Sequence, residues 1–122
     1  MIDESILEDI MKIKGYRAAA ISTNAGELII SDTQKLKTDL SEVSATFNDI
    51  FVDAHGVSKQ MGLGAAQLME IHTEGAVALM LCSGEEARVH LHMFAIFTLD
   101  GNVTLAKMAI KKILPKAVDL LA

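Results

Sequence analysis

The feature that most limits the fold is a set of three apolar segments with very little chain between them. Residues 67–73 (QLMEIHT), 76–82 (AVALMLC) and 88–98 (RVHLHMFAIFT) are separated by the turn sequences EG and SGEEA. Apolar runs bounded by such turns predict strands. A parallel crossover needs about a dozen residues, so strands joined this closely have to be antiparallel neighbours. The second half of the chain therefore predicts an antiparallel meander.

The remaining elements complete an α+β fold. Residues 16–22 and 27–31 flank the turn sequence TNAG and predict a hairpin, which the polar segment 32–39 connects onward. Apolar residues at helical spacing predict helices over 2–14, 39–61 and 102–114, and Pro115 is expected to end the last one or kink a short continuation. We expect a single domain over residues 1–122, with a five-stranded antiparallel sheet between helices in the order α-β-β-α-β-β-β-α.

The helix over 39–61 has the clearest pattern in the chain. Its apolar residues recur at alternating spacings of three and four: Leu40, Val43, Phe47, Ile50, Ala54, Val57 and Met61. A stripe of this kind is expected to cover one face of the sheet. Phe51 and His55 lie beside it.

Composition excludes several classes of function. Sixteen acidic residues against eleven basic ones give a net charge of −5, which argues against binding nucleic acid or an anionic membrane. The acidic start MIDESILEDI does not resemble a signal peptide, and no apolar run is long enough to span a bilayer. We expect a cytoplasmic protein. The apolar fraction of 51% is high for a short chain and suggests a buried interface between copies.

His90 and His92 lie two apart on a predicted strand, so their side chains are expected on one face with Phe94 and Ile96. His72, on another predicted strand, could approach them, and three imidazoles could hold a metal. A metal site also needs partners behind its ligands and an open position. The favoured interpretation is structural, with the imidazoles hydrogen-bonded at the sheet edge or under a helix. Partner contact and metal binding are the alternatives, and no metal ligand is assigned.

No catalytic or cofactor-binding residue is expected. The sequence GLG at 62–64 lacks the remainder of a phosphate-binding loop and predicts the end of a helix. Cys82 ends an apolar strand, where a free cysteine is commonly buried and inert, and no serine lies in a G-x-S-x-G context. These features predict a protein that is not an enzyme and has no cofactor.

The same segments, in the same order, resemble the Roadblock / dynein-light-chain family over nearly the whole chain. The resemblance is carried by GYRAAAISTNAGELIIS, SEVSATFNDIFVDAHGVSKQMGLG, LMEIHTEGAVALML and RVHLHMFAIFTLDGNVTLAKMAIKKIL. The two histidines depart from the family's usual aliphatic last strand, and Gly101 is the nearest counterpart to a glycine usual early in the last helix. The resemblance implies a profilin-like Roadblock architecture and a homodimer that works by binding.

Family members serve as adaptors on motor complexes or regulate small Ras-like GTPases, and some accelerate GTP hydrolysis. The resemblance therefore implies a regulator or scaffold of a small Ras-like GTPase. The alternatives are a structural adaptor without effect on nucleotide turnover and, third, a small metal- or ligand-binding protein. If an arginine finger were supplied, it would be Arg17 or Arg88; the favoured interpretation of both is an ordinary strand-flanking charge.

A homodimer is expected to form through the central helix and the strand that follows it. Residues 67–73 begin the meander and are predicted at a sheet edge, where an unblocked apolar strand invites pairing with a second chain. The residues expected at this interface are Ser44, Phe51, His55, Ser58, Leu68, Met69 and Ile71.

Overall fold

Five strands form the centre of the fold. In the computed structural model, which describes residues 2–33 and 39–122, they are β1 (Tyr16–Thr23), β2 (Leu28–Asp32), β3 (Leu68–His72), β4 (Val77–Cys82) and β5 (Leu91–Phe97). They join in the order β2-β1-β5-β4-β3, and every neighbouring pair is antiparallel. Within these described ranges, β3 therefore has a partner strand on one side only. Of the polar connection predicted over 32–39, residues 34–38 lie outside the described part of the chain.

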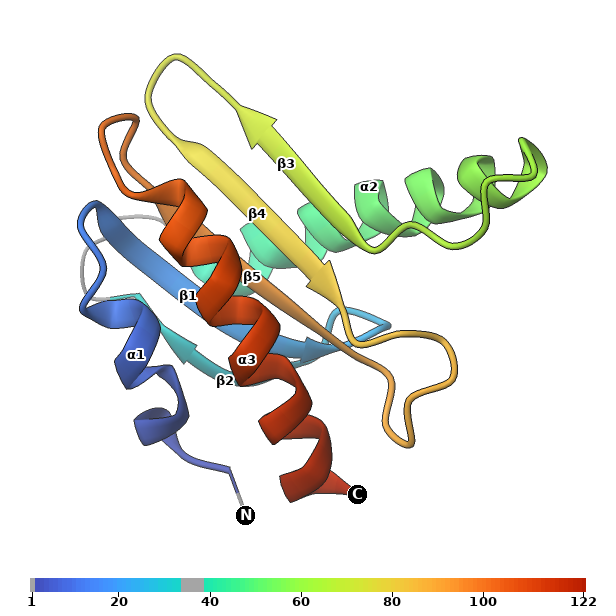
Figure 1. The fold of residues 1–122 in the computed structure, drawn as a ribbon, viewed down its shortest axis with the longest axis horizontal. Helices are drawn as coiled ribbons and strands as arrows, with labels where there is room; N and C mark the ends of the chain where they lie inside the picture. The colour runs from blue at the N-terminus through green and yellow to red at the C-terminus, as the bar shows by residue number, and fades with distance from the viewer. Residues whose placement is uncertain (1, 34–38) are drawn as a thin grey trace.

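Helices cover both faces of this sheet (Figure 1). A 3-10 turn (Glu4–Leu7), helix α1 (Glu8–Met11) and helix α3 (Val103–Leu121) lie on one face, and helix α2 (Leu40–Gln60) crosses the other. The predicted α+β class and the order α-β-β-α-β-β-β-α are confirmed. Within residues 2–33 and 39–122, no helix has the length and apolar content needed to cross a membrane.

The two terminal helices differ in length from the prediction. The first was predicted over 2–14 but is short, because bonds from the amides of Ile13 and Tyr16 to the carbonyls three residues back tighten the chain into consecutive turns. The last does not end at Pro115 but continues to Leu121. Ala117 and Val118, beyond the proline, are buried, so packing on the sheet outweighs the backbone hydrogen bond that proline cannot donate.

The face that α2 turns toward the sheet was predicted wrongly. The residues it buries are Leu40, Ser44, Asn48 and Phe51. Of the predicted stripe, Phe47 packs against Phe94, with ring centroids 5.1 Å apart, but Ile50 and Val57 are 46% and 53% exposed. The buried line is displaced by about one residue, a rotation of roughly 100° about the helix axis. The helical spacing thus identified an apolar face of α2, but it did not predict which residues of the helix pack on the sheet.

A contact between two glycines fixes the start of β1 against the turn before α3. Gly15 has a φ of +90°, and a Cβ placed on it would lie 2.4 Å from the Cα of Gly101. Backbone bonds hold the contact: Thr98 N–H donates to the Gly15 carbonyl at 2.8 Å, and Asn102 N–H to the Lys14 carbonyl at 2.9 Å. Only glycine fits position 15 in this conformation.

Candidate functional site

The outer side of α2 presents an apolar surface that the rest of the described chain leaves uncovered. Its residues are Ile50, Ala54, Val57 and Met61, and all four are exposed. Leu63, just beyond the helix, is 71% exposed. We call this surface the α2 line. The C-terminal half of α2, from which these residues come, extends past β3, the strand at the edge of the sheet (Figure 1). Contiguous exposed apolar surface of this kind marks an interaction site.

The open edge itself is a strand without a blocking residue. Leu68, Met69 and Ile71 of β3 are half-buried, and no proline interrupts them. Glu70 is held by the ammonium of Lys107 at 2.8 Å and by His72, and these partners, Lys107 first, lower the pKa of its carboxyl. The Glu70 carboxylate is therefore paired within its own chain, and the edge of β3 stays available to a further strand.

The structure separates the expected interface residues into two groups. Leu68, Met69 and Ile71 lie on the edge strand, and His55 and Ser58 are half-buried on α2. Ser44 and Phe51, in contrast, are buried at 3% and 0% exposure inside the protomer. They hold α2 on its own sheet and do not offer surface in this conformation.

Beneath α2 lies a polar cluster that contains two of the histidines. His92 is buried, and its Nδ1 lies 2.6 Å from Oδ1 of Asn48, while the Asn48 amide nitrogen donates to the carbonyl of Asn24 at 3.0 Å. His92 lies on β5 and His90 immediately precedes it, and their rings meet edge to face, so the two share a face as predicted from their spacing. Both border a pocket with Phe51 and His55 of α2. Burial, followed by the charges of His90 and His55, lowers the pKa of His92 to about 4. The imidazole is thus neutral at neutral pH.

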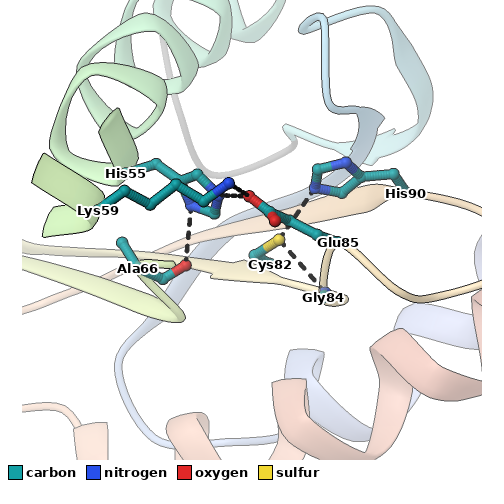
Figure 2. Close-up of polar contacts among 7 residues, drawn as sticks. All are labelled: His55, Lys59, Ala66, Cys82, Gly84, Glu85 and His90. Carbon is teal, nitrogen blue, oxygen red and sulfur yellow. Dashed lines mark hydrogen bonds and ion pairs between the residues drawn. The ribbon is translucent and has the colours of Figure 1, made fainter. Parts of the chain in front are cut away.

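Cys82 is the partner of His90. Its Sγ lies 3.1 Å from Nε2 of His90 and accepts the amide N–H of Gly84 at 3.3 Å (Figure 2). Burial raises the pKa of the thiol and lowers that of His90. Sequence reasoning missed this pairing, because it depends on the register that sets Cys82 opposite His92.

His72 does not approach the other two histidines. It pairs with Val77, which pairs with Phe97, whereas His92 pairs with Cys82 at the other end of β4. The expectation that His72 could join them is wrong, because the β3–β4 hairpin reverses the chain and carries His72 to the opposite end of the sheet. Its ring is mostly exposed and bonds Glu70 instead.

A charged group stands beside the cluster at the end of α2. Nδ1 of His55 lies 3.2 Å from the Ala66 carbonyl, and its Nε2 lies 2.5 Å from a carboxylate oxygen of Glu85 (Figure 2). The carbonyl and the carboxylate oxygen both accept hydrogen bonds, so each ring nitrogen of His55 faces an acceptor. Lys59 binds the same oxygen at 2.6 Å, and these two partners, Lys59 first, lower the pKa of Glu85.

Comparison with solved structures identifies the fold. The chain is similar to the Roadblock/LC7 domain from Streptomyces avermitilis, with a TM-score of 0.82 at 8% identity over 98% of this chain and 97% of that one. It is similar to MglB of Myxococcus xanthus, with a TM-score of 0.78 at 15% identity over 96% and 89%. A third similar structure, described as MglB with a tetrameric arrangement, gives 0.75 at 15% identity over 89% and 79%.

No protein-family model matches the chain, and its sequence matches no curated protein. At 8–15% identity the structural likeness concerns architecture. The protein is thus an α+β protein with a five-stranded antiparallel sheet. More particularly, it has the Roadblock/LC7 fold, as the sequence resemblance implied.

Proposed function

We propose that this chain is a non-catalytic, cytoplasmic binding protein that forms a homodimer through α2 and β3. The observation that carries this proposal is the α2 line. Ile50, Val57 and Met61 are 46%, 53% and 62% exposed, although they belong to the most regular apolar pattern in the sequence. They lie beside a strand that has a free edge. Apolar residues and an open edge on adjacent elements suit a second copy of the same surface.

In the proposed dimer a two-fold axis beside β3 joins the two edge strands and sets the two α2 helices side by side. Leu68, Met69 and Ile71 meet their copies across the strands, and the α2 lines meet across the helices, with His55 and Ser58 at the margin. Ser44 and Phe51 act from inside, by holding α2 in position. An interface of this obligate type buries roughly 2,000 Å² or more.

The oligomeric state tests this arrangement directly. Light scattering at micromolar concentration should give twice the chain mass of 13.1 kDa. Ile50→Asp should yield the monomer, because it places a charge in the α2 line. Leu105→Asp is the matched control: Leu105 is 45% exposed, like Ile50, but lies on α3 across the sheet. A monomeric wild type, or dissociation by both variants alike, would refute the interface.

We further propose that the dimer regulates a small Ras-like GTPase. The support is the family resemblance, now joined by the Roadblock/LC7 fold. Arg88 is an exposed cation on the β4–β5 loop, and its guanidinium lies 3.4 Å from the carboxylate of Asp119. The favoured interpretation of Arg88 is an ordinary charge at the flank of a strand, so activation of a partner would come chiefly from repositioning the partner's own residues.

The turnover assay separates the functional alternatives. GTP hydrolysis by small Ras-like GTPases of the same genome is measured with and without this protein. A faster rate supports an activator, and binding without a change in rate supports an adaptor. Absence of both binding and rate change for every such GTPase would remove GTPase regulation from the proposal.

A further inference from the structure

Three side chains of metal-ligating type meet beneath α2. Cys82 ends β4, His92 lies opposite it on β5, and His90 immediately precedes β5. One donor atom from each of the three lies within 4.8 Å of the donor atoms of the other two. Figure 2 shows the thiol of Cys82 directed toward the ring of His90. We propose that Cys82, His90 and His92 bind a zinc ion.

The donor set and its spacing fit zinc. A thiolate and two imidazoles form a borderline-soft set of the kind that Zn²⁺ takes in tetrahedral sites. With bonds of about 2.3 Å to sulfur and about 2.0 Å to nitrogen, a tetrahedral ion holds these two ligand atoms about 3.5 Å apart. The observed separation between Sγ of Cys82 and Nε2 of His90 is 3.1 Å, so the pair needs to open by only a few tenths of an ångström.

A partner behind His92 prepares that ring for a metal. The amide of Asn48 is oriented by its bond to the Asn24 carbonyl, so its Oδ1 faces His92 and accepts the Nδ1 proton at 2.6 Å. This fixes the tautomer and leaves Nε2 of His92 with a free lone pair. Zinc-binding histidines are typically held in this way, with the second ring nitrogen donating to an oxygen. Asn48 is therefore a positioning residue for the site.

Zinc binds neutral imidazoles and a thiolate. The Cys82 thiol must lose its proton, and the amide N–H of Gly84 is placed to stabilise the resulting thiolate. Metal affinity should therefore increase with pH as the thiol ionises.

The ion would also have access to solvent and to a fourth ligand. A pocket of about 160 Å³ is bordered by His90, His92 and Glu85, and a second of about 270 Å³ is bordered by Cys82 and Glu85. Glu85 borders both pockets and is 39% exposed. Its carboxylate or a water molecule completes the tetrahedron. A bound ion would join the ends of β4 and β5 beneath α2.

Zinc titration of the tag-free chain, stripped of metal with a chelator, tests the site. Calorimetry should show one Zn²⁺ bound per chain. Cys82→Ser and His90→Gln should each lower the affinity at least tenfold, because each removes one ligand. His72→Gln is the matched control, since His72 is an exposed histidine at the far end of the sheet and should leave the affinity unchanged.

A second measurement decides the matter if the variants fail to fold. Cobalt(II) added to the wild type should produce a thiolate-to-metal charge-transfer absorption, and Zn²⁺ should remove it and slow alkylation of the thiol. The chain has one cysteine, so both signals report Cys82 alone. A flat zinc titration, a cobalt spectrum without that band, or equal loss of affinity in His72→Gln would overturn the proposal.

Discussion

The two faces of the sheet are closed to different degrees. On the face of α1 and α3, α3 covers a large cluster of buried apolar residues, and the Tyr16 hydroxyl donates to Asp32 at 2.6 Å. On the face of α2, the apolar cluster is smaller, and the polar residues Ser44, Asn48 and His92 are buried beside it. The helix with the more regular apolar pattern thus makes the more polar contact with its own sheet. The apolar stripe of α2 is thus left partly exposed, with Ile50 at 46% and Val57 at 53%.

The largest expected effect on stability comes from truncating one isoleucine to alanine on each helix, α3 and α2. Ile110→Ala on α3 should lower the free energy of unfolding by about 2–5 kcal/mol, because Ile110 is fully buried and leaves a cavity. The decrease in unfolding free energy caused by Ile110→Ala should be the same at every protein concentration. The decrease in unfolding free energy caused by Ile50→Ala should disappear on dilution, because Ile50 contributes through contacts in the proposed dimer. Denaturant unfolding over a concentration series makes the comparison, and equal losses at all concentrations would mean that Ile50 belongs to a closed core.

Acid should destabilise the α2 face selectively. The pKa of His92 is about 4 in the folded protein against 6.5 ordinarily, so the unfolded chain binds its proton more readily. Stability should therefore fall as the pH drops from about 6.5 toward about 4, by an amount on the order of 2 kcal/mol. His90, whose pKa is also lowered, contributes in the same direction.

Unfolding measured across that pH range checks the effect. His92→Gln retains a donor toward Asn48 but does not titrate, so it should flatten the slope. A slope unchanged by His92→Gln would mean that other groups cause the acid sensitivity.

The smallest expected effect on stability comes from the ion pair that joins α3 to the edge strand β3. Lys107→Met removes the ammonium that reaches from α3 to Glu70 on β3, a partly exposed pair at 2.8 Å. Pairs of this kind contribute about 0.2–1 kcal/mol and are screened by salt. The difference in unfolding free energy between Lys107→Met and the wild type should thus shrink at high ionic strength. A difference that persists in concentrated salt would mean that Lys107 stabilises the fold through its aliphatic carbons and not through its charge.

The topology could be predicted because short connections leave few choices. The turns between β3, β4 and β5 admit only antiparallel neighbours, and this also predicted the edge position of β3. The face of α2 could not be predicted, because helical spacing looks the same whether an apolar stripe meets its own sheet or a second chain. Asn48 in the middle of the helix was a signal, since its amide is buried on the sheet side.

The histidine cluster was only half predictable. Spacing along one strand predicted that His90 and His92 share a face, and they do. Which third residue lies beside them depends on the register of strand pairing, and a single sequence does not specify that register. Register set Cys82 beside them and moved His72 away.

The central position of β5 has a consequence for how the chain folds. Tyr16 pairs with Phe97 and Thr23 with Leu91, so the middle of the sheet joins two segments that lie far apart in the sequence. The β3–β4–β5 meander closes through local contacts, whereas β1 and β2 must wait for β5 before they gain a place in the sheet. Closing so long a loop slows folding. On the ribosome, the first hairpin therefore emerges long before its partner strand, and the sheet cannot be completed until β5 has been synthesised.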